Sequence, residues 1–138
     1  MTSVGSQLSL KGKTALLADD VEINREIIIG LLEETEIIIE CAENGREALE
    51  LFAADPDKFD IIIMDINMPV MDGVEATRRI RSLKTPRGKQ VPIIAVTANV
   101  LPEEVAGYIN AGMNGHVGKP VDFDTLVPIL DKYLKNLS

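Results

Sequence analysis

Five polar side chains stand at or directly after the ends of short apolar runs, and their chemistry is complementary. They are Asp19, Asp20, Asp65, Thr97 and Lys119. Three carboxylates gathered in one place raise each other's pKa, and a hard divalent cation such as Mg²⁺ or Mn²⁺ relieves the repulsion. A threonine hydroxyl and a lysine ammonium can hold the oxygens of a phosphoryl group. The set predicts phosphoryl transfer onto a carboxylate, with an aspartyl phosphate as the product.

Asp65 is the predicted nucleophile of this set. It ends the central apolar run, 59–65, and a loop follows it, so it is the best placed of the acids. Asp19 and Asp20 form an adjacent pair that is predicted to hold the metal ion. An acid at one strand end often does no more than cap a helix, as Asp20 could for the helix that follows. Residues of complementary chemistry at four strand ends favour a functional site instead.

The elements that position these side chains alternate along the chain. Apolar runs predict strands at 14–18, 36–42, 59–65, 91–98 and 115–119. Helical spacing predicts helices at 22–34, 46–54, 74–83, 102–111 and 123–137, and the Pro- and Gly-marked segment 84–90 is predicted to be a loop. Strict alternation is typical of an α/β fold, a doubly wound parallel sheet with helices on both faces. Ligands of such sheets bind at the carboxyl ends of the strands.

Composition and charge narrow the classes of function. With 138 residues, 46% of them apolar and 26% charged, the chain has the balance of one globular domain, predicted over 12–138 after a flexible lead at 1–11. The net charge of −8 disfavours direct binding of nucleic acid. The single cysteine, Cys41, allows no intramolecular disulfide and is predicted to be buried. The sequence shows no signal peptide and no membrane-spanning stretch, so we expect a cytoplasmic location.

The chain resembles the response regulator receiver domain over about residues 12–136. The resemblance rests on Asp19-Asp20, on IIIMDINMPVMDG at 61–73, on VTA at 96–98 and on GKP at 118–120. It implies a flavodoxin-like (βα)5 fold with the sheet order 2-1-3-4-5 and a role in two-component or phosphorelay signalling. It also implies that Asp65 is the phosphoacceptor and that the aspartyl phosphate shifts the conformation of the domain.

The same resemblance assigns metal-binding and lifetime-tuning roles. Asp20, Asp65 and the backbone carbonyl of Asn67 would bind Mg²⁺, and Asp19 would help through water. Asn67 and Asn99 would flank the path of a hydrolytic water. Because amides cannot act as general bases, we expect slow hydrolysis of the acyl phosphate and no enzymatic turnover.

The resemblance also implies a switch. Thr97 and Lys119 would hold the phosphoryl oxygens, and the Lys119–Pro120 peptide bond is expected to be cis. In this family the threonine moves toward the phosphoryl group and an aromatic residue on the fifth strand follows it inward. His116 stands at the matching position, where Tyr or Phe is usual. We expect His116 to perform the same switch as a smaller aromatic; a pH-sensitive modulator and an uncoupled, exposed side chain are the alternatives.

The helix predicted at 22–34 offers a surface for a partner. Its predicted core face consists of Asn24, Ile27, Ile28 and Leu31. Ile23 and Ile29 fall outside that face, and exposed isoleucines beside the site suit docking of a histidine kinase or a histidine phosphotransfer domain. Packing of both against the neighbouring loop is the alternative. The segment DVEIN at 20–24 is most similar to receivers of hybrid histidine kinases.

Other interpretations of the motifs are weaker. A haloacid-dehalogenase-type phosphatase needs an aspartate as general acid two residues after its nucleophile, and Asn67 stands there. A receiver-like interaction module that is never phosphorylated would not need the complete acid set. Flavin binding would need stacking aromatics, and the chain has no Trp, two Tyr and three Phe. Self-association through a face within 102–137, frequent in the family, is left open, as is the part of Tyr108 and Tyr133 in it.

Overall fold

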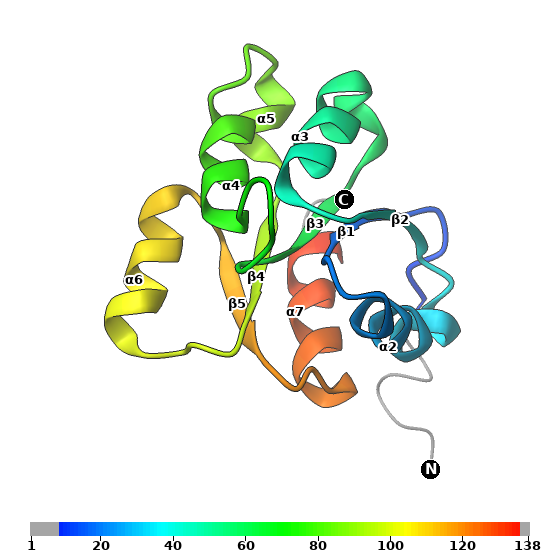
Figure 1. Ribbon diagram of the computed structural model, residues 1–138. Coiled ribbons are helices and arrows are strands. Elements are labelled where there is room, and N and C mark those ends of the chain that lie inside the picture. The colour runs from blue at the N-terminus through cyan, green and yellow to red at the C-terminus, as the bar shows by residue number, and fades with distance from the viewer. Residues whose placement is uncertain (1–8, 136–138) are drawn as a thin grey trace.

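The computed structural model describes residues 9–135, and within them five parallel strands form one sheet between two layers of helices (Figure 1). The strands are β1 (Thr14–Ala18), β2 (Ile38–Ala42), β3 (Ile61–Asp65), β4 (Ile93–Thr97) and β5 (Gly115–Gly118). Their order across the sheet is β2-β1-β3-β4-β5. The predicted flavodoxin-like topology and its strand order are therefore confirmed.

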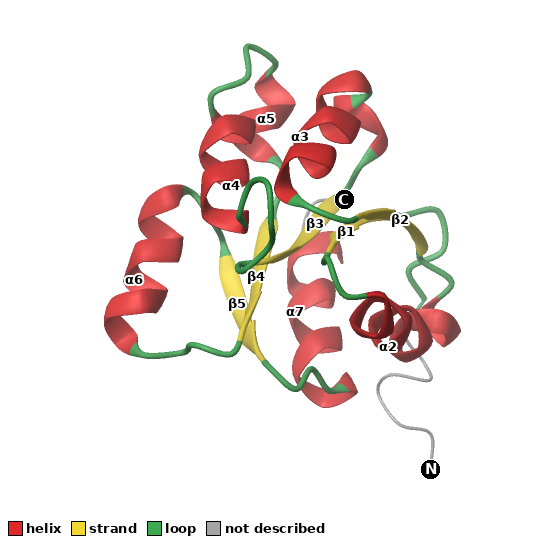
Figure 2. Ribbon diagram, in the orientation of Figure 1, coloured by secondary structure: helices red, strands yellow, loops and turns green. Residues whose placement is uncertain are grey.

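Helices cover both faces of this sheet (Figure 2). Within the described residues they are α2 (Glu22–Leu32), α3 (Gly45–Ala54), α4 (Gly73–Arg81), α5 (Pro86–Gln90), α6 (Pro102–Ala111) and α7 (Phe123–Lys135). Two 3₁₀ turns lie at Glu33–Thr35 and Pro56–Lys58. Side chains of α2 and α7 pack on one face of the sheet, and those of α3, α4 and α6 pack on the other. Side chains of successive strand residues pack against opposite helical layers, as the two-residue period of a strand requires.

The three central strands consist entirely of buried residues. Every residue of β1, β3 and β4 is buried, and the polar ones stand only at strand ends. A polar group in mid-strand would be buried without water, which is costly, so the polar chemistry is confined to the ends. β2 and β5 lie at the edges and are partly exposed. Cys41 of β2 is consequently half-buried rather than buried as predicted, and desolvation raises the pKa of its thiol.

One predicted loop is a helix. The segment 84–90 contains α5, because its proline begins a helix instead of interrupting one. Thr85 caps α5 by accepting a hydrogen bond from the backbone N–H of Arg87 at 3.4 Å, and Arg87 Nη2 donates to the carbonyl of Phe59 at 2.8 Å. The assignment of 84–90 as a loop is therefore wrong, and the count of helices in the described chain rises by one.

The buried stripe of α2 also differs from the predicted one. Ile28 is buried as predicted, and Asn24 and Leu31 are half-buried. Ile27, predicted to face the core, is 48% exposed. Leu32 takes its place in the core because it lies one turn after Ile28 on the same face. The prediction for Ile27 is wrong, and the error leaves an extra exposed isoleucine on α2.

The packed part of the chain begins before the first strand. Of the lead predicted at 1–11, residues 1–8 lie outside the described range. Leu10 is buried in the core, and its N–H donates to the carbonyl of Thr35 at 2.7 Å. At the other end, residues 136 and 137 of the last predicted helix lie outside the described range. No helix within residues 9–135 is long and apolar enough to cross a membrane.

Candidate functional site

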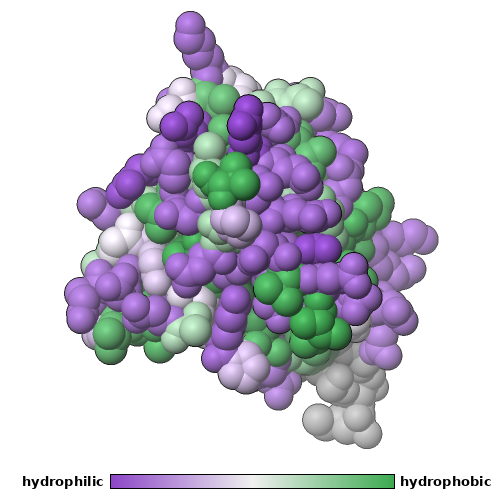
Figure 3. Space-filling view, viewed as in Figure 1, coloured by the Kyte–Doolittle hydropathy of each residue, from purple (hydrophilic) through white to green (hydrophobic). Residues whose placement is uncertain are grey.

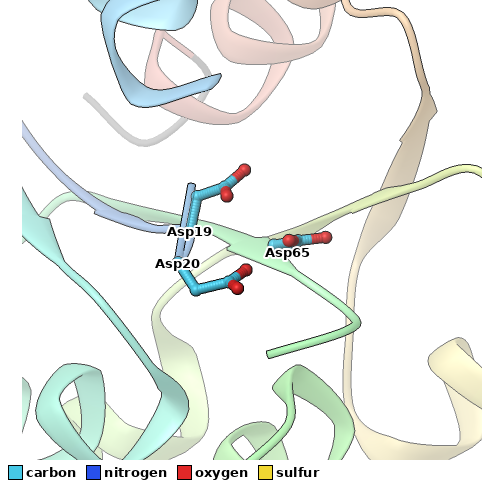
Figure 4. A group of neighbouring side chains, drawn as sticks. All are labelled: Asp19, Asp20 and Asp65. Carbon is cyan, nitrogen blue, oxygen red and sulfur yellow. The ribbon is translucent and has the colours of Figure 1, made fainter. Parts of the chain in front are cut away.

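Two neighbouring strands bring three carboxylates together. Asp19 and Asp20 directly follow β1, and Asp65 ends β3, the strand that pairs with β1. One carboxylate oxygen of each residue lies within 4.8 Å of the other two, and all three carboxylates project from the strand ends to the same side (Figure 4). Asp19 and Asp65 are buried and Asp20 is exposed. The cluster therefore has a closed side against the protein and an open side toward solvent.

Local hydrogen bonds hold Asp19 in place. Its Oδ1 accepts a hydrogen bond from the backbone N–H of Val21 at 2.9 Å, just before α2 begins. Arg25 Nη1 of the first turn of α2 donates to the Asp19 carbonyl at 2.7 Å. Neither aspartate caps α2, because its N-cap residue is Val21 and no side chain caps this helix. The Asp20 carboxylate is left facing solvent, where it can bind a ligand.

A glycine allows the loop after Asp65 to close tightly. Gly73, the first residue of α4, lies so close to the backbone carbonyl of Asp65 that a Cβ on it would collide with that oxygen. The Gly73 N–H donates to the carbonyl of Ile66 at 2.9 Å, and Asp72 caps α4 by accepting from the N–H of Glu75 at 2.8 Å. These contacts explain why the segment after β3 ends in Asp-Gly, and they fix the backbone that carries Asp65.

Lys119 provides the positive charge of the site. It follows β5, its backbone N–H donates to the Thr97 carbonyl at 2.9 Å, and the Lys119–Pro120 peptide bond is cis. Its Nζ lies 3.0 Å from Asp65 Oδ1. Burial raises the pKa of the Asp65 carboxyl above its usual value, and the neighbouring Asp19 adds to this rise. Lys119 and the backbone N–H of Asn67 act in the opposite direction.

The oxygen donors of the cluster suit a hard divalent cation. Three carboxylates face one ammonium group, so the pocket carries excess negative charge. Asp65 Oδ1 is buried, and the Lys119 ammonium lies 3.0 Å from it. A carboxylate oxygen can accept a further positive ligand beside such an ion pair. Carboxylate ligands on one side and open space for water on the other are what Mg²⁺ favours.

Thr97 differs from the other predicted site residues because its hydroxyl is turned to another part of the chain. It is buried at the end of β4. Its Oγ1 accepts from the backbone N–H of Asn99 at 2.9 Å and lies 3.2 Å from the hydroxyl of Tyr108. Within the described chain no hydrogen bond joins the Thr97 hydroxyl to Asp65 or Lys119. The fold brings Thr97 to the site but not into contact with the acids.

The remaining predicted residues are exposed or half-buried. Asn67 and Asn99 are exposed and lie two residues after Asp65 and Thr97, respectively. His116 is half-buried in β5, and its side chain forms no hydrogen bond or ion pair with another described residue. Tyr108 was considered only for a self-association face, yet it is buried and touches Thr97. Tyr108 and Ala111 lie three residues apart on α6, a spacing that indicates one buried helical face. The contact with Thr97 joins residues eleven positions apart across a loop, and helical spacing does not predict it.

Comparison with known proteins identifies the family. Residues 15–131 match the family described as the response regulator receiver domain, so the chain belongs to that family. It is 35% identical over 143 residues to Probable histidine kinase 4 of Oryza sativa subsp. japonica, covering 91% of this chain and 14% of that protein. It is also 35% identical over 122 residues to Hybrid signal transduction histidine kinase M of Dictyostelium discoideum, covering 88% and 5%. The chain thus spans a small part of these relatives, and the predicted likeness to receivers of hybrid histidine kinases is confirmed.

Solved structures agree with this assignment. The receiver domain of the sensor histidine kinase PA1611 from Pseudomonas aeruginosa PAO1, with magnesium coordinated in its active-site cleft, has a TM-score of 0.79 and 34% identity, covering 90% of this chain and 98% of that one. Chemotaxis protein CheY4 of Vibrio cholerae has a TM-score of 0.79 and 32% identity, covering 88% and 98%. The chain is therefore a receiver domain of the two-component and phosphorelay type.

Proposed function

We propose that Asp65 accepts a phosphoryl group from a phosphohistidine donor in a Mg²⁺-dependent reaction. The observation that carries this proposal is the buried Asp65 carboxylate, which is ion-paired with Lys119 and clustered with Asp19 and Asp20. In the reaction an Asp65 oxygen attacks phosphorus, the P–N bond to the donor imidazole breaks, and the released imidazole takes a proton from water. The product is an aspartyl phosphate and a free histidine.

The residues of the site have separate tasks in this reaction. Lys119 opposes the rise that burial causes in the pKa of the Asp65 carboxyl, and its ammonium lies where it can neutralise a phosphoryl oxygen. Asp19 and Asp20, with Asp65 and the backbone carbonyl of Asn67, are the proposed metal ligands. Mg²⁺ bound there would spread the negative charge that builds up on the transferred group.

The proposed product persists because the two residues expected beside the path of a hydrolytic water are amides. Asn67 and Asn99 flank the site, and an amide cannot take a proton from a hydrolytic water. The chain therefore promotes its own phosphorylation and a slow dephosphorylation without turning over a substrate. Thr97 would turn its hydroxyl from the β4–α6 loop toward the phosphoryl group. This movement would couple phosphorylation of Asp65 to a conformational change of the domain.

The proposed partner is the phosphohistidine-bearing helical domain of a histidine kinase or a phosphotransfer protein. Ile23 and Ile27, one turn apart on α2, are 58% and 48% exposed, and an apolar patch covers this part of the molecule (Figure 3). Ile29, also predicted to be exposed, is 39% exposed. A cavity of about 180 Å³ lies between α2 and Lys119 and is lined by Ile27 and Val121 among others. An apolar side chain of the donor could fill it while the histidine reaches Asp65. We propose that donor and receiver meet in the cytoplasm.

Intact mass after incubation with acetyl phosphate tests the proposal. The wild-type chain should gain one phosphoryl group with Mg²⁺ and none without it. Asp65→Asn should gain none, and Asp57→Asn, which changes an exposed aspartate outside the site, should behave as wild type. No adduct on the wild type, together with no binding of Mg²⁺, would contradict the proposal and leave a receiver-like interaction module.

A further inference from the structure

The helix α6 is attached to the rest of the domain by few side chains. Most of its residues are exposed, and those buried are Tyr108 and Ala111. Tyr108 is 4% exposed and packs in the core layer that also contains Met64 and Ala95. It is the largest buried side chain of α6, so its position governs how the helix sits on the sheet.

The Tyr108 hydroxyl belongs to a closed set of hydrogen bonds with Thr97 and Asn99. Tyr108 donates to the carbonyl of Asn99 at 3.1 Å, and the N–H of Asn99 donates to Thr97 Oγ1 at 2.9 Å. The Thr97 and Tyr108 hydroxyl oxygens lie 3.2 Å apart, whereas Thr97 Oγ1 is 3.4 Å from the Asn99 carbonyl. The Asn99 carbonyl lies closer to the Tyr108 hydroxyl than to that of Thr97, which favours Tyr108 as its donor and leaves the single proton of Thr97 for the Tyr108 oxygen.

A phosphoryl group on Asp65 would compete for that proton. Thr97 can donate one hydrogen bond only, so it cannot serve both Tyr108 and a phosphoryl oxygen. The pair is buried, and no bulk water is at hand to replace the lost bond at Tyr108. His116 has no comparable link, since its side chain forms no hydrogen bond with a described residue.

We infer that Tyr108 is a positioning residue that holds the Thr97 hydroxyl away from Asp65 and transmits its release to α6. This inference rests on the proposed phosphorylation of Asp65. When Thr97 turns to the phosphoryl group, the bond to Tyr108 breaks and α6 loses one of its few attachments. The surface that changes is the outer side of α6 and the loop before it, where Leu101 and Ile109 are 55% and 46% exposed. Tyr108, rather than His116, is the residue that couples the site to this surface.

Tyr108→Phe tests the inference, because it removes the hydroxyl and keeps the ring. Beryllofluoride, which mimics the phosphoryl group on an aspartate, is titrated with Mg²⁺ while backbone amide resonances are followed. The concentration for half-saturation should fall about fivefold in Tyr108→Phe, since the bond that opposes binding is gone. The α6 amides of the unliganded variant should already lie shifted toward their bound positions. A thermal melt checks that the variant is folded.

Tyr133→Phe is the matched control. It removes a tyrosine hydroxyl that donates to the carbonyl of Asn114 at 2.9 Å, away from Thr97, and it should titrate as wild type. His116→Ala should leave the α6 response in place. Half-saturation unchanged in Tyr108→Phe, or loss of the α6 response in His116→Ala alone, would overturn the inference. Failure of the wild type to bind beryllofluoride would instead contradict the proposed function, and the inference with it.

Discussion

The two halves of the carboxyl edge of the sheet hold their polar side chains in different ways. At β1 and β3, the backbone amide of Val21 fixes Asp19, and the close approach of Gly73 fixes the chain at Asp65. At β4, Thr97 is held by hydrogen bonds to a loop and to Tyr108 of a largely exposed helix. The difference indicates that the acid half, at β1 and β3, keeps one geometry for the proposed metal and phosphoryl group. The threonine half, at β4, is held by contacts that can change.

Glycine replacements on the two halves give the largest expected difference. Gly73→Ala places a methyl group against the Asp65 carbonyl and should lower the free energy of unfolding by roughly 2–4 kcal/mol. Gly107→Ala on α6 meets no atom within 4 Å and should raise it by about 0.5–1 kcal/mol, because alanine favours the helix. Urea denaturation measures both values. Equal effects of the two variants would contradict the contrast between a tightly packed half and a loosely attached one.

Lys119→Met tests the electrostatics of the acid half. Loss of the ammonium should slow phosphorylation by acetyl phosphate about 100-fold, because developing charge on phosphorus loses its fixed partner. Affinity for Mg²⁺ should not fall, since a positive charge beside the carboxylates is removed. Rates from intact mass and metal affinity from calorimetry measure the two effects. Lys132→Met, at an exposed position on α7, is the control; a Lys119→Met rate equal to that of this control would disprove the assigned role.

The predicted site and the structure agree where neighbouring strands dictate position. Asp19, Asp20 and Asp65 meet because parallel strands end at one edge, and that follows from alternating apolar runs. The partners of Thr97 could not be predicted in this way, since Tyr108 reaches it from a helix whose placement depends on packing across the whole domain. The wrong prediction for Ile27 has the same cause, because the exposure of this side chain depends on how packing rotates α2 about its axis.

Ile27→Ser should separate docking from chemistry. An exposed apolar contact at the centre of an interface is typically worth 1–2 kcal/mol, so phosphotransfer from a phosphorylated histidine domain should slow about tenfold. The rate with acetyl phosphate should not change, because a small donor does not need the α2 surface. Ile38→Ser, on the edge strand β2 at 56% exposure, is the matched control. Equal slowing with both donors would place Ile27 in the chemistry of the site instead.

The smallest effect concerns the stability cost of the buried acid. Burial raises the pKa of Asp65 in the folded state above its usual 3.8, so the ionised carboxylate destabilises the fold at neutral pH. Asp65→Asn should therefore raise Tm by a few degrees at pH 7 without Mg²⁺. Well below pH 3.8 the carboxyl is protonated in folded and unfolded chains alike, and the difference should vanish. Thermal melts across this range check the sign; a lower Tm for the variant at pH 7 would show that Lys119 outweighs burial.

The location of the phosphoryl group tests the central claim most directly. Borohydride reduces an aspartyl phosphate to homoserine, and tandem mass spectrometry of the digested protein then locates the modified position. After incubation with acetyl phosphate and Mg²⁺, homoserine should appear at position 65 and at no other aspartate, and the yield should disappear when Mg²⁺ is chelated. Homoserine at position 19 or 20, or an unmodified Asp65 in a chain that has gained a phosphoryl group, would contradict the assignment of Asp65 as the acceptor.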